Sequence, residues 1–385
     1  MMKTRIGSQF KTLQTELQSI LRREIDYYQI KPRVSTLFIT FRCNSKCKTC
    51  SMWQRPQDEE IEKEINLDEW KIIIDKLTFA GIESVEIFGG NALLRKEIVI
   101  SLMKYLYEKG ITIHMPTNQM GLDDEVAEAI ARYVDTAYLS IDAPGEQQDS
   151  VRGIVGAAHQ AEDAVEKLIR FKHNIHDRIN PLKVVCNCTV SKFNVGTLKD
   201  MVPYALAKGF DRVDFEYAGE FDRQDVNDSA LLGITPDAQY IRQDETILAN
   251  RNEALQIKQS LREIRKTHKH SPIVIETLNI DSLSLTNLYE GSIPHTKCYV
   301  KRNEVTIDPY GNIVACPFIT NLSFGNLVSE PFNQIWSNEK HGIFDKAQCS
   351  GRLPMCKSCI LGVQRNPGMA KSLQRIYLSK IRPKL

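Results

Sequence analysis

Short runs rich in β-branched and aromatic residues alternate with stretches of helical periodicity between residues 35 and 217. The short runs predict six strands, at 35–41, 83–88, 111–116, 136–142, 182–190 and 211–217. The stretches between them predict helices at 68–80, 95–109, 123–132, 158–173 and 196–208. Such alternation indicates a parallel sheet with right-handed crossovers. We therefore expect an α/β fold, a partial (β/α)6 TIM-type barrel with its chemistry at the carboxyl ends of the strands.

The segments on either side of this repeat predict further helices and one more strand. Residues 8–28 have the spacing of an amphipathic helix, which could cap the barrel floor or touch an anionic surface. A long helix is expected at about 236–268 and a strand at 272–277. The basic amphipathic tail could pack on the barrel or lie on an anionic surface. The predicted domains are an N-terminal helix, a barrel, a helical bridge, a cysteine-containing domain and a basic tail, at 1–34, 35–235, 236–297, 298–362 and 363–385.

Composition excludes several classes of protein. A net charge of +2 gives no general attraction to nucleic acid, and no run of eighteen apolar residues predicts a membrane span. No apolar signal segment is visible near residue 1, so the ten cysteines favour metal ligation over disulfides. The sequence therefore predicts a protein of a reducing compartment, the cytoplasm.

Three cysteines directly follow the first predicted strand. Cys43, Cys47 and Cys50 have the spacing C-x3-C-x2-C, and no fourth cysteine lies nearby in the sequence. Three thiolates can hold three corners of an iron–sulfur cube and leave the fourth iron open to a small molecule. A partial zinc site or a set of inert thiols is the alternative.

This motif and its place after the first strand resemble the radical S-adenosylmethionine (radical SAM) superfamily. The resemblance implies that the three cysteines hold a [4Fe–4S] cluster whose open iron binds S-adenosylmethionine. It also implies reductive cleavage of that cofactor to a 5′-deoxyadenosyl radical, with a flavodoxin- or ferredoxin-type electron donor. Thr49 departs from the family, which usually has an aromatic residue just before the third cysteine.

The resemblance also implies a set of cofactor-binding residues at the strand ends. Gly89 and Gly90 match the glycines of the family's GGEP motif, with Asn91 in place of the glutamate. A neutral amide can accept a hydrogen bond without charge assistance. The remaining matches are a Thr-Asn pair, a Ser-x-Asp and an arginine: Thr117, Asn118, Ser140, Asp142 and Arg152. A purely structural pairing of Asp142 with Arg152 is the alternative.

The fifth and sixth predicted strands carry polar side chains that alternate with apolar ones. On the sixth, Arg212, Asp214 and Glu216 should face the lumen, where Asp214 and Glu216 are candidate substrate-contacting, catalytic residues. The alternative is an edge strand with its charges in solvent. On the fifth, Cys186 and Cys188 are expected to point outward, which leaves Asn187 facing the cofactor. One of those two cysteines as a hydrogen-atom donor is a further possibility.

A second group of cysteines follows residue 297. Cys298 and Cys316 enclose a predicted β-hairpin around 309–312. The pattern C-x12-G-x4-C resembles the SPASM/twitch extension of radical SAM enzymes. That resemblance implies one auxiliary [4Fe–4S] cluster held by Cys298, Cys316 and the C-x2-C pair Cys356 and Cys359, with structural zinc as the alternative. Cys349 is left over, as a substitute ligand, a hydrogen-atom donor or an inert thiol.

The expected function is that of a radical SAM oxidoreductase or isomerase-type enzyme that removes hydrogen from its substrate. Only about 34 residues precede the first strand, too few for a separate leader-binding domain. This favours a small polar substrate of the sugar, aminocyclitol or nucleoside type, oxidised or epimerised with help from the auxiliary cluster. A ribosomal-peptide or protein side-chain maturase is the alternative. A non-catalytic iron–sulfur electron-transfer protein is the competing class.

Overall fold

The computed structural model describes residues 31–55 and 61–361, apart from positions 177, 179, 239, 243, 294–297 and 299 and the side chain of Leu278. The helix predicted at 8–28 and the basic tail predicted at 363–385 lie outside these residues. None of the helices in the described part of the chain is both long and apolar enough to cross a bilayer.

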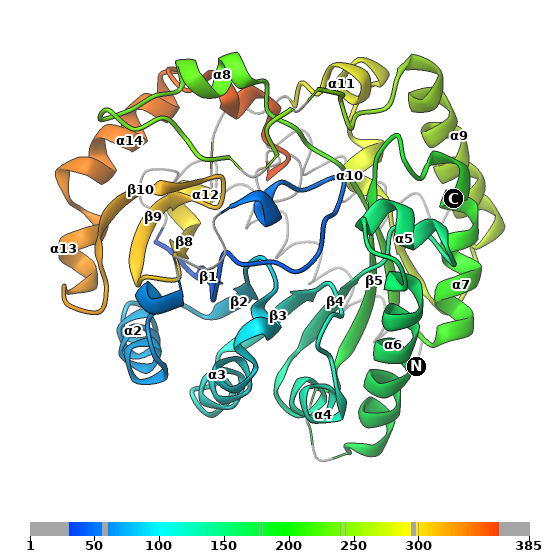
Figure 1. The fold of residues 1–385 in the computed structure, drawn as a ribbon, viewed down its shortest axis with the longest axis horizontal. Helices are drawn as coiled ribbons and strands as arrows, with labels where there is room; N and C mark the ends of the chain where they lie inside the picture. Colours follow the sequence, from blue (N-terminus) through cyan, green and yellow to red (C-terminus); the bar gives the residue numbers. More distant parts are fainter. Residues whose placement is uncertain are drawn as a thin grey trace, which may run out of the picture.

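A single curved sheet of ten strands forms the centre of the molecule, in the order β10-β9-β8-β1-β2-β3-β4-β5-β6-β7 (Figure 1). Neighbouring strands are parallel from β8 through β1 to β7, whereas β8, β9 and β10 are antiparallel to one another. The strands are β1 Val34–Phe38, β2 Ser84–Phe88, β3 Thr112–Thr117, β4 Thr136–Ser140, β5 Lys183–Val190, β6 Arg212–Tyr217, β7 Val274–Glu276, β8 Glu304–Ile307, β9 Asn312–Cys316 and β10 Ile319–Asn326. The six predicted barrel strands are therefore confirmed, with ends that differ by up to three residues.

Helices cover the outer face of this sheet (Figure 1). The connecting and outer helices are α2 Leu67–Phe79, α3 Lys96–Glu108, α4 Asp124–Tyr133, α5 Gln147–Arg152, α6 Ala157–Asn174, η5 Val195–Asp200, α7 Met201–Lys208 and α9 Arg251–Thr267. Shorter ones are η2 Met52–Gln54, η3 Ile61–Lys63, η4 Ala92–Arg95, α8 Arg223–Asp228, α10 Leu278–Asp281, α11 Leu285–Glu290, α12 Val300–Asn303, α13 Phe332–Trp336, α14 Glu339–Cys349 and η6 Pro354–Ser358.

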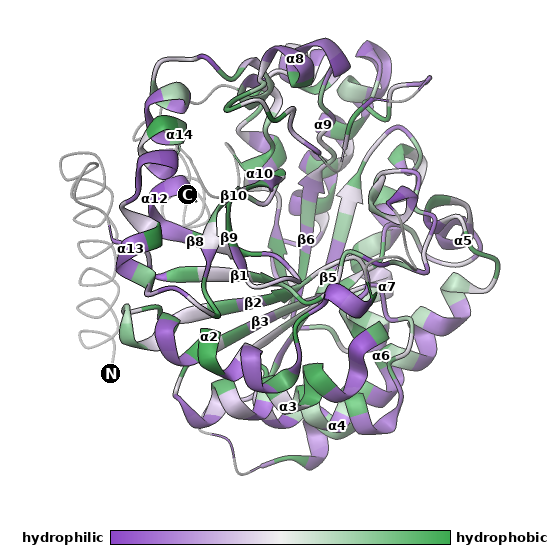
Figure 2. Ribbon diagram, turned by 60° about the vertical axis from the view of Figure 1, so that its left-hand side comes forward, coloured by the Kyte–Doolittle hydropathy of each residue, from purple (hydrophilic) through white to green (hydrophobic). Residues whose placement is uncertain are grey.

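The hydrophobic core lies between the sheet and its outer helices. Each outer helix has one apolar face toward the strands and a polar face toward solvent, as the green and purple sides of α3, α4 and α6 show (Figure 2). Fully buried residues from the helices, such as Trp70, Leu102 and Ile130, pack on strand residues such as Ile87 and Val184. Because the outside of the barrel is sealed by this packing, polar side chains on the strands are left to face the lumen.

The long helix predicted at 236–268 is wrong in its first half. Helix α9 begins only at Arg251, because Asn250 forms a reciprocal capping box with Glu253 and satisfies the free N–H groups of the first turn. Residues 235–238 and 240–242 instead form an irregular segment beside the barrel cavity, with Asp237 bonded to Arg55, just beyond the cysteine loop, and to Thr320 on β10.

The C-terminal cysteine-containing region continues the barrel sheet. Strand β8 is parallel to β1, with Val34 opposite Glu304 and Thr36 opposite Thr306. The predicted hairpin is confirmed, since β8 and β9 are antiparallel neighbours joined by the turn at 308–311. The strand that leads into the first cysteine motif therefore shares hydrogen bonds with the hairpin that carries Cys316.

Candidate active site

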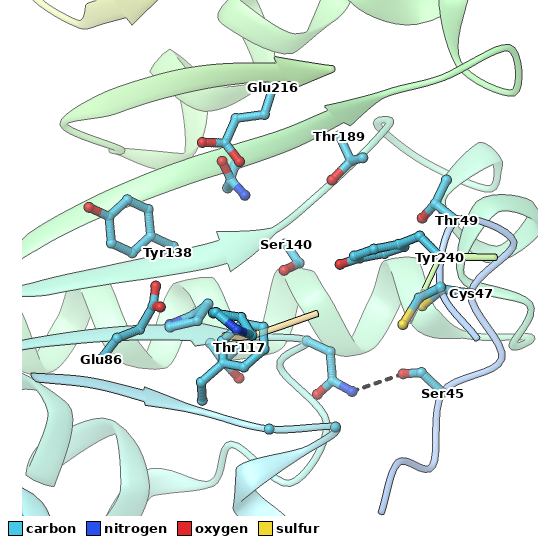
Figure 3. Close-up of a pocket in the computed structure, with 18 of the residues that line it drawn as sticks. Ser45, Cys47, Thr49, Glu86, Thr117, Tyr138, Ser140, Thr189, Glu216 and Tyr240 are labelled. Atoms are coloured by element: carbon cyan, nitrogen blue, oxygen red, sulfur yellow. Dashed lines mark hydrogen bonds between the residues drawn. The ribbon is translucent and has the colours of Figure 1, made fainter. Parts of the chain in front are cut away.

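A cavity of about 490 Å³ lies at the carboxyl ends of the barrel strands. Cys43, Cys47 and Cys50 form part of its wall, together with residues at the ends of β2, β3, β4 and β5 (Figure 3). Residues of the C-terminal region, Pro317, Phe318 and Ile360 among them, line the same cavity. Both cysteine-containing parts of the chain therefore border one chamber.

The loop that carries the three cysteines is fixed by two close backbone approaches. A Cβ atom on Gly90 would lie 2.2 Å from the carbonyl oxygen of Arg42, and Asn91 N–H donates to that oxygen at 2.8 Å. On the other side, a Cβ atom on Gly153 would lie 2.2 Å from the carbonyl oxygen of Lys46, and the Gly153 φ of +67° is left-handed. Only glycine fits at either position, so both sides of the loop depend on it.

A buried ion pair anchors the start of this loop. Glu64, whose side chain is 2% exposed, pairs with Arg42 at 3.0 Å and with Arg95 at 3.3 Å. It also accepts a hydrogen bond from Thr40 Oγ1. Arg95 in turn donates to the carbonyl oxygen of Ile39 at 3.2 Å. The strand end before Cys43 is therefore held by side chains as well as by the sheet.

The thiols of the loop receive N–H groups from their surroundings. Ser45 N–H points at Cys43 Sγ and Met52 N–H at Cys50 Sγ, both at 3.4 Å, and Arg152 Nη1 lies 3.7 Å from Cys47 Sγ. Burial raises the pKa of Cys43, and it raises that of Cys50 to about 12. Thiols that are buried or half-buried and face N–H donors suit metal ligation, in which the metal takes the place of the proton.

The three thiols of the loop are not arranged around one metal ion. Within residues 31–55 and the described part of 61–361, no three His, Cys, Asp or Glu side chains are arranged to hold one metal ion. Thiolates on one zinc each lie about 2.3 Å from it and so about 4 Å from one another. A cube with a separate iron for each thiolate places them further apart. Three thiols with the spacing C-x3-C-x2-C suit a [4Fe–4S] cluster that has one open iron.

Most of the predicted cofactor-binding residues lie on the wall of this cavity. Asn91 donates to Asn44 Oδ1 at 2.9 Å. Asn118 donates to Ser45 Oγ at 2.9 Å, the dashed bond at Ser45 in Figure 3, so both asparagine side chains also brace the cysteine loop. The predicted residues that line the cavity are Gly89, Gly90, Asn91, Thr117, Asn118, Ser140, Arg152 and Asn187.

Asp142 is the exception and requires a correction. It is fully buried behind the cavity wall, pairs with Arg152 at 2.9 Å and accepts from Thr189 N–H at 2.8 Å. The strand β4 ends at Ser140, so the alternation that would bring Asp142 to the lumen stops before it. Asp142 orients Arg152 and does not reach the space that a ligand would fill.

Strand β6 directs its charged side chains into the lumen, as predicted. Arg212, Asp214 and Glu216 all line the cavity, and the alternative of an edge strand is wrong because β6 lies between β5 and β7. Arg212 pairs with Asp214 at 2.7 Å. Burial outweighs this pairing and raises the pKa of Asp214 to about 6.

The floor of the lumen is also polar. A second cavity, of about 290 Å³, lies at the amino ends of the strands and shares Glu86 and Tyr138 with the first. Thr36 Oγ1 lies 3.3 Å from Glu86 Oε2 and 2.7 Å from Glu304 Oε1. The barrel interior is therefore lined by hydrogen-bonding groups along much of its length, in contrast to a packed apolar core.

Cys186 and Cys188 point away from the lumen. Both are fully buried in the apolar core, and the Cys188 thiol contacts the carbonyl oxygen of Asp142 at 3.5 Å. Asn187 between them lines the cavity. The possibility that either cysteine donates hydrogen to a substrate is wrong for this geometry, because neither reaches the chamber.

Four thiols of the C-terminal region lie near enough to influence one another electrostatically. The charge of Cys298 acts on Cys316, Cys356 and Cys359, and burial together with this mutual repulsion raises the pKa of Cys356 to about 12 and those of Cys316 and Cys359 well above the usual range. Such a set fits the single auxiliary cluster, whose metal charge would remove the repulsion.

Cys349 is not part of this group of thiols. It is exposed at the end of α14, and its sulfur lies 3.1 Å from Nζ of the buried Lys301. It lines neither cavity. The structure therefore places Cys349 at the end of α14, outside both cavities, and a role as hydrogen-atom donor stays an untested prediction.

Several residues that line the cavity were not predicted from the sequence. Glu86 and Tyr138 alternate with buried residues on β2 and β4, and that alternation was the signal for them. Tyr240 and Phe318 come from irregular segments, where no periodicity indicates which side chain faces the barrel.

Comparisons with known proteins agree with this geometry. The sequence model of the radical SAM superfamily matches residues 37–191, and the SPASM model, an iron–sulfur cluster-binding domain, matches residues 298–360. Fe-coproporphyrin III synthase from Methanosarcina barkeri is 26% identical over 334 residues, 83% of this chain and 77% of that protein. PqqA peptide cyclase from Bradyrhizobium diazoefficiens is 24% identical over 338 residues, 85% of this chain and 78% of that protein.

A similar fold occurs among solved structures. The crystal structure of Streptococcus suis SuiB bound to precursor peptide SuiA has a TM-score of 0.60 and 15% identity, over 90% of this chain and 76% of SuiB. At that identity the likeness concerns the fold, a mostly parallel sheet with antiparallel strands in the C-terminal region.

Proposed function

Because the chain belongs to the radical SAM superfamily and carries a C-terminal SPASM iron–sulfur domain, we propose that it is an enzyme that modifies a side chain of a peptide or protein. The observation that carries the proposal is the single chamber bordered both by the Cys43–Cys47–Cys50 loop and by the C-terminal region. A substrate in this chamber would lie within reach of both cofactor sites.

The chemistry belongs to the cofactors, and the chain supplies binding and orientation. When bound, a [4Fe–4S] cluster and S-adenosylmethionine supply a 5′-deoxyadenosyl radical that abstracts hydrogen from a substrate. Cys43, Cys47 and Cys50 would hold the cluster. Arg152, oriented by Asp142, offers a cation to the cofactor carboxylate, while Ser140 and Asn187 offer hydrogen bonds to its ribose.

The C-terminal cysteines supply a second cofactor site. Cys298, Cys316, Cys356 and Cys359 would hold an auxiliary cluster, which suits a reaction that removes an electron from the substrate radical. Net oxidation is therefore the outcome we favour. A flavodoxin- or ferredoxin-type protein would supply the electron that begins each turnover.

Relatives support one of the two substrate classes considered from the sequence. PqqA peptide cyclase by its name acts on a peptide, and SuiB has been crystallised with a precursor peptide. Both similarities extend over most of this chain. They favour the peptide alternative over the small polar substrate that the short N-terminal segment had suggested.

Similarity to Fe-coproporphyrin III synthase supports a second candidate function. That relative matches 83% of this chain, and the peptide cyclase matches 85%. A tetrapyrrole-modifying enzyme is therefore the alternative to a peptide-modifying one. The acidic lumen residues Asp214, Glu216 and Glu86 favour a substrate that presents hydrogen-bond donors there over one that presents carboxylates.

The test is anaerobic turnover of the reconstituted enzyme with a chemical reductant. We expect 5′-deoxyadenosine from the wild type and none from Cys43→Ala, with Cys186→Ala as a control that should match the wild type. Peptides encoded beside the gene are then incubated with the enzyme and searched for mass loss. Turnover of an iron porphyrin but of none of these peptides would exclude the peptide proposal, and absence of 5′-deoxyadenosine from a fully loaded wild type would exclude both.

A further inference from the structure

Tyr240 places a phenol at the centre of the chamber. Its ring lines the cavity together with Cys47, Thr49 and Cys50, and its hydroxyl is directed inward, on the side of Ser140 (Figure 3). In the described part of the chain, this hydroxyl has no hydrogen-bond partner. A partly buried phenol usually finds such a partner, so its direction into a cavity indicates a ligand that supplies one.

The ring is fixed from behind by aromatic residues. Tyr240 contacts Phe318 edge-on with 5.6 Å between ring centroids, and Phe318 contacts Phe221 at 5.2 Å. The backbone is fixed as well, because Phe221 N–H donates to the Tyr240 carbonyl at 2.7 Å. Phe318 lies two residues after Cys316, so the wall that supports Tyr240 belongs to the auxiliary hairpin.

The segment before Tyr240 connects the two cysteine regions. We call residues 235–242, position 239 excepted, the strap. Asp237 on the strap accepts a hydrogen bond from Arg55 Nη2 at 2.5 Å. Arg55 lies just beyond the cysteine loop in the sequence. The same carboxylate accepts from Thr320 N–H at 2.9 Å and from Thr320 Oγ1 at 2.7 Å on β10. One carboxylate therefore joins the strap to Arg55, just after the cysteine loop, and to β10 of the auxiliary region.

Tyr240 and Arg152 offer different groups to the same cavity. The phenol is uncharged at neutral pH, so its ring and hydroxyl suit a flat partner with hydroxyl groups. The Arg152 guanidinium suits a carboxylate.

On the premise of the proposed function, we propose that Tyr240 is a binding residue for the adenosyl half of S-adenosylmethionine. The strap makes this binding depend on the auxiliary hairpin. Loss of the Asp237 contacts lets Tyr240 and Phe318 move away from the cysteine loop and so weakens cofactor binding, although Asp237 does not touch the cofactor.

The test is equilibrium dialysis of S-adenosylmethionine against the fully loaded, unreduced enzyme under argon, where no cofactor is cleaved. Tyr240→Phe should weaken binding about fivefold, the value of one net hydrogen bond. Tyr240→Ala should weaken it at least tenfold, because the stacking surface is lost as well. Asp237→Asn should weaken it about threefold to tenfold, with iron content per chain equal to that of the wild type.

Matched controls are Tyr289→Phe and Tyr289→Ala on α11 and Asp228→Asn at the end of α8, all of which should bind like the wild type. Dissociation constants within twofold of wild type for both Tyr240 variants, at full iron content, would overturn the inference. A raised KM for the substrate at unchanged cofactor affinity would also overturn it and assign the ring to the substrate. A fully loaded wild type that does not bind S-adenosylmethionine would instead overturn the proposed function.

Discussion

Gly90 has a hydrogen atom where other residues have a Cβ atom, and this difference allows a close backbone contact at the site. The glycine allows β2 to end against the carbonyl of Arg42, and that contact sets the position of the loop that carries Cys43. The sequence could point to this pair of glycines as a place of close approach, but which backbone they approach depends on strand order, which only the assembled sheet provides.

Replacement of Gly90 by alanine tests this contact. The added Cβ would lie 2.2 Å from a backbone oxygen that has no room to move, so we expect a loss of about 1–3 kcal/mol in stability and a loss of iron from the first cluster. Thermal unfolding and iron content per chain measure the two effects. The control is Gly196→Ala, where a Cβ meets no atom within 4 Å and φ is not positive. Equal behaviour of the two variants would contradict the explanation.

Asp214 should make stability depend on pH in an unusual direction. Burial raises its folded pKa to about 6, above the value of 3.8 that an exposed aspartate has. Its contribution to stability is therefore full below pH 4 and is lost as pH rises through 6, by up to roughly 3 kcal/mol.

Comparison with Asp214→Asn isolates this effect. The amide does not titrate, so the wild type should lose stability relative to the variant between pH 4 and pH 6, with little further change above pH 7. Thermal unfolding at a series of pH values under argon gives the difference. A difference that grows in favour of the wild type as pH rises would show that the ion pair with Arg212 outweighs burial.

At the scale of elements, the barrel strands and helices followed from periodicity because each has one apolar face. The beginning of α9 did not, because its start depends on capping. Residues 236–250 contain no strong helix breaker after Pro236, yet the chain becomes helical only where Asn250 and Glu253 cap each other.

Asn250→Ala should remove about 1 kcal/mol of stability, the usual value of such a cap. Asn252→Ala, in the exposed first turn of the same helix, is the matched control and should change stability little. Chemical denaturation of the two proteins provides the comparison. A smaller loss for Asn250→Ala than for Asn252→Ala would show that tertiary packing and not the cap starts this helix.

The auxiliary hairpin carries a second element-scale prediction. Replacement of Cys316 by alanine should reduce the iron bound per chain from about eight atoms to about four, since one cluster loses a ligand and the other does not. Cys349→Ala should keep the full amount, because that thiol faces Lys301. Iron loss in Cys349→Ala alone would make Cys349 a ligand after all.

At the scale of the molecule, one continuous sheet joins the barrel to the auxiliary region. The two family models leave residues 192–297 unmatched between them. The sequence analysis predicted a domain boundary after residue 297. Periodicity could find β8 as half of a hairpin but could not show that its other edge is bonded to β1, since that contact spans about 270 residues.

Thermal unfolding should therefore be a single transition. The absorbance of both clusters should disappear at the temperature at which the helical signal is lost, because neither region can open without breaking the β1–β8 ladder. Absorbance and circular dichroism recorded on one sample test this. Two transitions more than a few degrees apart would show that the regions unfold independently.

The β1–β8 ladder also determines how this architecture can be recombined. A chimera cut in the bridge before Cys298 would place the β1 of one parent beside the β8 of the other, so the ladder would form between strands of different parents. A cut in the turn after Ile307 keeps the ladder, but it leaves Cys298 with one parent and Cys316, Cys356 and Cys359 with the other. The auxiliary cluster of such a hybrid would be ligated by cysteines from both parents. One metal site would therefore depend on two parent sequences at once.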